Sequence, residues 1–86
     1  MHTVELLEEA LKLAAGLGYQ IRTEWLGGDG GGDCEINGQK WIFIDLAMSP
    51  TEQLDEVVET LRREPAAATQ TTCPKLRRLV EVRKSA

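Results

Sequence analysis

Histidine, cysteine and aromatic residues are all scarce in this chain of 86 residues. The single histidine, His2, stands next to the N-terminus, where chains are commonly poorly ordered, so it completes neither a Cys-His catalytic pair nor a zinc site. Two cysteines allow one disulfide at most, and without a recognisable secretion signal both are expected to stay reduced. No apolar run approaches the ~18 residues of a membrane span. We therefore expect a cytoplasmic protein with no cofactor and no membrane association.

Positive charge is also in short supply, since the net charge is −4. Residues 1–64 carry 13 acidic and 5 basic side chains, a net of −8, whereas residues 65–86 carry 1 acidic and 5 basic, a net of +4. This balance argues against non-specific binding of nucleic acid. The basic C-terminal segment is expected to dock on the acidic body or to reach an acidic partner.

Two helices are predicted from apolar spacing and start signals. The first begins with Thr3 as its N-cap, carries an apolar stripe at spacings of three and four, and ends at Gly16 or Gly18, with Gly18 favoured. The second begins with Ser49-Pro50-Thr51-Glu52, a capping box with proline at the first helical position, and ends at Glu64-Pro65.

Three strands are predicted between these helices. From Tyr19 to Trp25 apolar and polar residues alternate, as in a strand with one buried face. Asn37-Gly38 joins two further strands in a two-residue hairpin, which would pair Ile36 with Gln39, Glu35 with Lys40 and Cys34 with Trp41. Residues 41–44 are apolar on both faces, so the third strand should be the best buried and central.

The predicted fold is α+β, with a three-stranded, mainly antiparallel sheet and helices packed on one face, in the order α-β-β-β-α-α. Residues 1–64 would form the domain and residues 65–73 a linker. Residues 74–86 would form a basic helix that packs on the domain or is tethered to it, opened by Pro74. Residues 79–83 also alternate, so a fourth strand is the alternative there.

The glycine-rich stretch of residues 27–32 suggests a phosphate-binding loop at first sight. Such loops place glycines between a strand and a helix N-terminus, but here a strand follows, and Asp29 and Asp33 would repel an anion. The two aspartates also lack the ligand spacing of a calcium loop. A flexible connection between strands is favoured.

Two groups of side chains are candidates for chemistry. Cys73 precedes Pro74 at a predicted helix start with basic residues nearby, conditions that lower a thiol pKa, and it would form a redox or sensor pair if it met Cys34. An ordinary capping residue and a small buried strand residue are the plainer interpretations. Asp55, Glu56 and Glu59 gather carboxylates on one helix as weak metal candidates, but a solvated charged face neutralised by nearby arginines is favoured.

The order of these motifs resembles a group of small, uncharacterised bacterial proteins. The shared features are the glycine-rich turn, Cys34, the strand Ile42-Phe43-Ile44-Asp45 and the helix start at residues 49–52. That group in turn resembles the front half of the ImmA/IrrE-type zinc peptidases, where a strand hairpin precedes a helix bearing His-Glu-x-x-His. Residues 55–59 occupy the place of that motif, and only Glu56 matches it, because both histidines are absent. The resemblance implies a peptidase-like half-fold without peptidase activity.

These observations favour a small cytoplasmic, non-catalytic interaction or regulatory module, whose partner is another protein or a second copy of the chain. The candidate contact residues are Trp25 and Trp41, which a thin sheet covered on one face would leave open, together with Cys34. The alternatives are a thiol-based sensor that uses Cys34 and Cys73, and an inactive metallopeptidase-like remnant.

Overall fold

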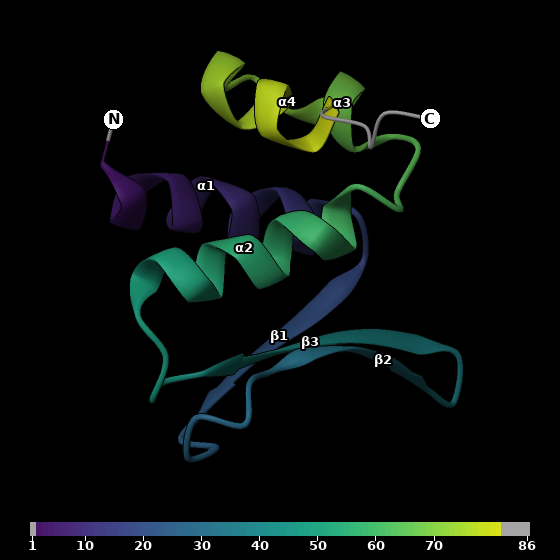
Figure 1. Ribbon diagram of the computed structural model, residues 1–86. Coiled ribbons are helices and arrows are strands. Elements are labelled where there is room, and N and C mark those ends of the chain that lie inside the picture. Colours follow the sequence, from purple (N-terminus) through teal and green to yellow (C-terminus); the bar gives the residue numbers. More distant parts are fainter. Residues whose placement is uncertain (1, 82–86) are drawn as a thin grey trace, which may run out of the picture.

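Three layers make up the protein, as the computed structural model of residues 2–81 shows (Figure 1). A three-stranded sheet forms one outer layer, helices α1 (Thr3–Gly16) and α2 (Pro50–Leu61) form the middle layer, and helices α3 (Ala67–Gln70) and α4 (Pro74–Glu81) form the other outer layer. The predicted α+β class is confirmed, and all helices lie on one side of the sheet. None of the helices in the described part of the chain is long and apolar enough to cross a membrane.

Helix α1 begins one residue earlier than the predicted cap implied. His2 is the N-cap, and its backbone N–H donates to the Glu5 carboxylate at 3.0 Å, so an acidic side chain also lies near the positive end of the helix dipole. The helix ends at Gly16, and Gly18 follows in the left-handed conformation with a φ of 100°. Gly18 thus reverses the chain into β1, as glycine permits without steric cost.

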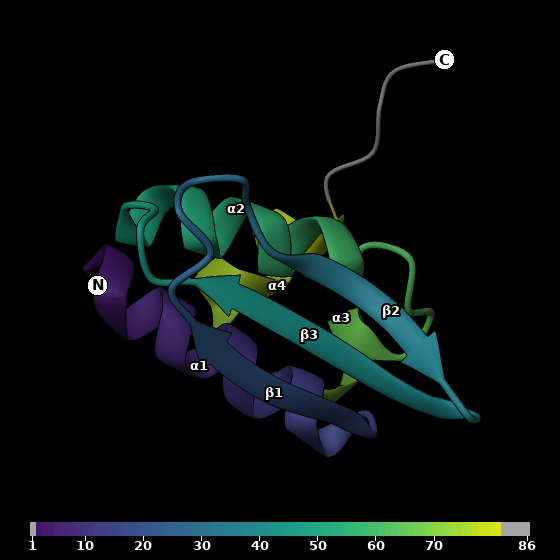
Figure 2. The same ribbon diagram turned by 90° about the horizontal axis from the view of Figure 1, so that it is seen from below.

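The sheet is mixed, and the prediction of a mainly antiparallel sheet was wrong. The strand order is β1-β3-β2, in which β1 (Tyr19–Glu24) is parallel to β3 (Gln39–Asp45) and β2 (Gly32–Ile36) is antiparallel to it. The loop of residues 25–31 carries the chain past the end of β3, so β2 enters on the far side and β3 returns beside β1 (Figure 2). Alternation in sequence predicts strands and their faces, but it does not specify their neighbours.

The hairpin of β2 and β3 has the predicted register. Ile36 pairs with Gln39, Glu35 with Lys40 and Cys34 with Trp41, and β3 is the central strand. Asn37 and Gly38 both have positive φ, 52° and 80°, as a type I′ turn requires.

Helix α2 starts at the predicted residue. The Glu52 N–H donates to the Ser49 hydroxyl at 3.2 Å, and the Ser49 N–H donates to the Glu52 carboxylate at 3.0 Å, which completes the capping box. Its buried side chains, Leu54, Val57 and Leu61 among them, face the core.

The C-terminal segment packs on the middle layer. Residues 65–73, predicted as a linker, contain the short helix α3, whose Ala67 is buried. Helix α4 buries Leu76 and Val80. Residues 79–81 belong to this helix, so the alternative of a fourth strand is wrong for them. Residues 82–83 lie outside the described residues.

One hydrophobic core runs through all three layers, because the middle helices bury side chains on both of their sides. Its members are buried apolar residues from each layer: Leu6, Leu7, Ala10, Leu13, Ala14, Tyr19, Ile42, Ile44, Leu54, Val57, Val58, Leu61, Ala67, Cys73, Leu76 and Val80.

Candidate functional site

One face of the sheet has no helix over it. In Figure 2 the strands lie in front of the helices, and no element crosses this face. We call the open face six of the side chains that the strand pairings place on it: Gln20, Arg22, Cys34, Ile36, Trp41 and Phe43. The same pairings place Glu24, Gln39 and Asp45 at the ends of this face. Side chains alternate along a strand, so Tyr19, Ile42 and Ile44 point to the helical side instead.

Aromatic rings form the middle of the open face. Trp41 and Phe43 are two residues apart on the central strand, their ring centroids are 6.0 Å apart and the ring planes are inclined by 15°. Both rings are partly exposed, and Ile36, on the neighbouring strand, is 48% exposed. Parallel strands, such as β1 and β3, normally have both faces covered, so this row of partly exposed apolar side chains stands out.

The β1 border of the open face is polar and close to neutral, whereas the β2 border carries Cys34 and Ile36. Arg22, on β1, forms an ion pair with Glu24 on the same strand. Gln20 is exposed at the start of the strand. On the other border, Cys34 is exposed directly across from Trp41. The predicted proximity of Cys34 and Trp41 is therefore confirmed by the register.

The two cysteines lie in different layers. Cys34 is on the sheet, whereas Cys73 is buried next to Pro74, where helix α4 begins, and neither is in a disulfide. Because α1 and α2 lie between the sheet and α4, the fold does not bring these thiols together as one site (Figure 1).

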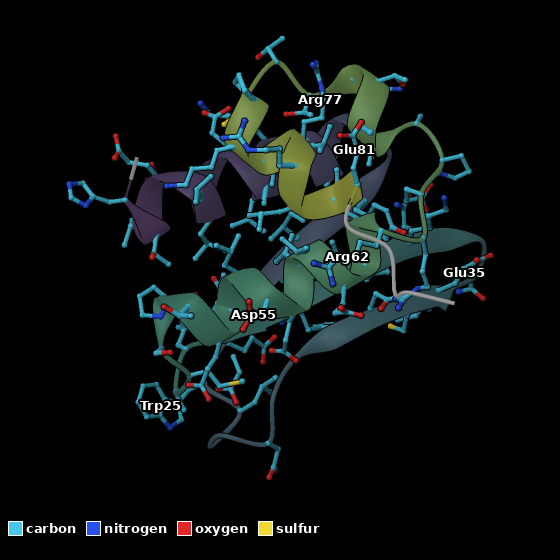
Figure 3. All side chains as sticks on the ribbon, turned by 45° about the horizontal axis from the view of Figure 1, so that its top comes forward. Trp25, Glu35, Asp55, Arg62, Arg77 and Glu81 are labelled. Carbon is cyan, nitrogen blue, oxygen red and sulfur yellow. The ribbon has the colours of Figure 1, made fainter. Side chains whose placement is uncertain are left out.

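Trp25 does not belong to the open face. It follows the last residue of β1 and is 73% exposed, at the end of the sheet opposite the hairpin turn (Figure 3). Leu46 follows the last residue of the parallel strand β3 and is 49% exposed, and its N–H donates to the Glu24 carbonyl at 2.9 Å. Trp25 and Leu46 are thus two exposed apolar side chains that directly follow the paired ends of β1 and β3.

The glycine-rich loop is organised around the carboxylate of Asp45, for which the sequence predicted no role. We call residues 25–31 the glycine arch, because they pass over the end of β3, where Asp45 is the last residue of the strand. Asp45 is completely buried and accepts four backbone N–H groups, those of Leu26, Gly28, Gly30 and Ala47, at 2.9 to 3.0 Å. Gly28 and Gly30 have φ of 90° and 85°, a conformation that turns their N–H groups inward.

The arch is therefore an anion cradle whose anion is part of the chain. Burial alone would raise the pKa of Asp45, but the hydrogen bonds from backbone amides outweigh it and hold the pKa below its ordinary value. The prediction of a merely flexible connection was incomplete. The available sequence signal was an acidic residue directly after the apolar run of residues 41–44.

The last glycine of the arch is fixed by close packing. A Cβ on Gly31 would come within 1.8 Å of the Phe43 carbonyl oxygen, so only glycine fits there. The Gly31 N–H donates to the Glu56 carboxylate of α2 at 3.2 Å. Glu56, the one residue that matches the peptidase motif, thus holds the arch from the helical side.

The three acidic candidates on α2 do not act together. Glu56 binds the arch, Glu59 pairs with Arg62 at 2.6 Å, and Asp55 is exposed (Figure 3). Within residues 2–81 no group of three or more His, Cys, Asp or Glu side chains is arranged to hold a metal ion.

A second polar cluster ties the sheet to the end of α2. The Tyr19 hydroxyl donates to Glu64 at 2.6 Å, and Lys40 donates to the same carboxylate oxygen at 3.0 Å. Burial, followed by the hydrogen bond to Glu64 and its charge, raises the pKa of Tyr19 to about 12. Hydrogen bonds from Tyr19 and Lys40 lower the pKa of Glu64. Lys40 lies opposite Glu35 in the predicted strand register, but its ammonium group bonds to Glu64.

A shallow hollow of about 310 Å³ lies where the glycine arch meets the open face. It is lined by Leu26, Asp33 and Phe43 and by the glycines of residues 30–32, which carry no side chains. A second hollow of about 340 Å³ lies between the end of α2, α3 and α4. The first hollow extends the aromatic row of the open face toward the edge strand β2.

Comparisons with known proteins give no further assignment. No protein-family model matches the chain, and no significant match was found among curated proteins or among solved structures.

Proposed function

We propose that this protein is a small, non-catalytic, cytoplasmic interaction module that binds a protein partner through the open face. The observation that carries the proposal is the stacked pair Trp41 and Phe43 on a central strand whose outer side no described element covers. Aromatic residues in the middle of a contact surface are the usual anchors of protein interfaces.

The charge distribution of the open face supports a protein partner over a nucleic acid. Its one cationic side chain, Arg22, is neutralised by Glu24, and the chain as a whole has a net charge of −4. Binding of a phosphate backbone rests on unpaired lysine and arginine. An apolar centre with a polar, neutral border along β1 is instead the anatomy of a protein contact.

The size of the open face indicates a modest contact. Three strands about 4.8 Å apart and up to seven residues long give a surface of roughly 14 by 23 Å, or about 300 Å². A standard stable interface buries about 800 Å² on each partner. The open face therefore supports a transient interaction, or one that extends beyond the face.

The two alternative hypotheses have less support. A sensor that joins Cys34 to Cys73 would have to bring together thiols from different layers. An inactive metallopeptidase-like remnant would have to use Glu56, which already accepts a hydrogen bond from the glycine arch.

Cys34 provides a direct test, because its thiol is exposed on the open face whereas that of Cys73 is buried. A benzophenone photo-crosslinker attached to Cys34 should form a crosslink to one partner in a lysate of the source organism. The crosslink should disappear when Trp41 and Phe43 are both replaced by serine. A folded double variant, checked by circular dichroism, is required.

The matched control moves the label to another layer. In Lys12→Cys with Cys34→Ser, the crosslinker stands on α1, where the Lys12 side chain is 76% exposed, and it should not reach the same partner. A crosslink that survives the double serine variant, or that appears equally from position 12, would contradict the proposal. A crosslink to a second copy would identify the partner as the chain itself.

A further inference from the structure

We propose that the outer edge of β2 binds an extended, basic peptide segment of the partner as a fourth strand of the sheet. This inference rests on the proposed function and names how the partner is held. Strand β2 is an edge of the sheet, and four of its five residues, from Asp33 to Ile36, are exposed. In the described part of the chain, no strand lies on its outer side.

The hairpin register determines which backbone groups of β2 face outward. In a hairpin closed by a two-residue turn, the pair next to the turn exchanges backbone hydrogen bonds, and such pairs then alternate with non-bonded ones. Ile36 and Gln39 form the first pair, so Glu35 and Asp33 stand in the non-bonded positions. Their N–H and C=O groups point away from β3 and are available to an incoming strand.

The edge strand is acidic on its helical side. Asp33 and Glu35 occupy the alternate positions that point toward α2, and Asp33 is already held by Arg63 and by the Thr60 hydroxyl. Glu35 stands near the hairpin turn and points away from the body (Figure 3). Among the described residues it is in none of the ion pairs.

Helix α2 extends this acidic surface beyond the edge. Glu56 and Thr60 face the glycine arch and β2, and Glu52 lies one helical turn from Glu56 on the exposed side. Arg62 pairs with Glu59 and Arg63 with Asp33, so the acidic excess of this surface rests on Glu35, Glu52 and Glu56. An added strand would place its helix-side residues over these carboxylates. Lysine or arginine at every second position of the partner segment is the complementary chemistry.

The other side of the added strand would join the open face. Its remaining residues would lie beside Cys34 and Ile36 and in line with the aromatic row. The hollow lined by Leu26 and Phe43 offers one of them a recess of about 310 Å³. The segment expected is therefore alternately basic and apolar.

A second copy of the chain fits this edge poorly. Two β2 strands side by side would bring Asp33 and Glu35 against the same acidic residues, and like charges opposite each other are destabilising. Five residues also bury far less than the about 800 Å² per partner of a stable dimer, but they suit a short peptide. The β1 edge has no such charge preference, because Arg22 and Glu24 on it neutralise each other.

Two fluorescein-labelled peptides of seven residues test the inference, one alternating lysine with valine and the other glutamate with valine. Fluorescence anisotropy should show at least about tenfold tighter binding of the lysine peptide. Amide hydrogen exchange followed by NMR should slow at Asp33 and Glu35 when the lysine peptide is added.

Substitutions of Glu35 distinguish the contribution of its backbone N–H to peptide binding from the contribution of its charge. Glu35→Pro removes an outward N–H together with the carboxylate, without removing a hairpin hydrogen bond, and it should weaken binding of the lysine peptide by at least about tenfold. Glu35→Gln removes the charge alone and should weaken binding less, so the difference between the two variants measures the contribution of the N–H. Glu35→Lys should weaken it by about fivefold, whereas Glu8→Lys, the same charge change on exposed α1, should change it less than about twofold. Glu35→Lys and the exchange data keep the test valid if the proline variant unfolds.

Equal binding of the two peptides, absence of binding, or protection of β1 amides in place of Asp33 and Glu35 would overturn the inference. Failure here is distinct from failure of the proposed function. If the Cys34 crosslink depends on Trp41 and Phe43 while the lysine peptide does not bind, the open face is the contact and the edge is not.

Discussion

The two faces of the same sheet differ in almost every property. On the helical side Ile42 and Ile44 are each 2% exposed, and polar side chains such as Tyr19 and Lys40 have defined partners. On the open side Trp41 and Phe43 contact each other and leave part of their surface in water. Neighbouring residues on the same strand therefore have different environments: those on the helical side stabilise the fold, and those on the open side are accessible.

The largest expected effect on stability comes from Ile42 and is compared with that of its neighbour on β3, Phe43. Ile42→Ala should lower the free energy of unfolding by about 3 kcal/mol, because it removes packed methyl groups from a full core. Phe43→Ala should cost only about 1 kcal/mol, since its ring is already partly hydrated and loses mainly the stacking on Trp41. Urea denaturation measures both. Equal losses would mean that the open face is part of the core.

Next in size is the glycine arch. In the natural protein four backbone N–H groups donate to the carboxylate of Asp45. Asp45→Asn replaces one of the acceptor oxygens by an NH2 group, which cannot accept these hydrogen bonds, so the melting temperature should fall by on the order of 10 °C. Asp29→Asn, an exposed change within the same arch, should leave the melting temperature nearly unchanged. Similar behaviour of the two variants would refute the role given to Asp45.

The same carboxylate predicts an acid dependence. The pKa of Asp45 is lower in the folded protein than its ordinary value of 3.8, so its stabilising contribution is present above that value and is lost as the pH falls through the folded pKa. Glu64 adds a similar loss below its ordinary value of 4.5. Melting temperatures between neutral pH and the acid limb should fall less steeply for Asp45→Asn than for the natural chain.

A smaller effect is expected at the second polar cluster. Tyr19→Phe should cost about 1 kcal/mol, because Glu64 keeps Lys40 as a donor. The pKa of Tyr19 is raised from 10.0 to about 12 in the folded state, so folding favours the protonated phenol. That contribution is complete below pH 10 and disappears as the pH rises toward 12. The phenylalanine variant should lack this part of the alkaline loss.

The smallest effect on stability should come from the residue that matters most for binding. Trp41→Thr should change the free energy of unfolding by less than about 1 kcal/mol, since threonine suits a strand and the ring is partly exposed. A loss as large as that of Ile42→Ala would place Trp41 in the core and remove the contrast between the faces.

How far the sequence predicts the molecule depends on the range of the interactions. Asn37-Gly38 and the capping box at Ser49 are local, so the hairpin register and the start of α2 were predicted correctly. The pairing of β1 with β3 joins Tyr19 to Lys40, and no local pattern specifies such a neighbour, so the parallel pair was missed. The Asp45 cradle was missed for the same reason, since its donors at Leu26, Gly28 and Gly30 precede it by 15 to 19 residues.

The positions of the candidate residues were likewise predicted only where a local pattern specified a pairing. Cys34 and Trp41 are joined by a predicted register and do lie together on the sheet. Trp25, Cys73 and the α2 carboxylates were proposed without a known long-range pairing, and they lie at the end of the sheet, next to α4 and on α2. Residue type suggests chemistry, but only a pairing that is already known predicts proximity.

The glycine arch also has a consequence for the order in which the chain folds. Its residues lose much backbone entropy on ordering, and the hydrogen bonds that compensate arise only after β3 has delivered Asp45. The local hairpin is thus expected in the rate-limiting transition state, with the arch closing and β1 docking after it. Chevron analysis should show that Asp45→Asn speeds unfolding and scarcely slows folding, whereas Gly38→Ala in the hairpin turn slows folding.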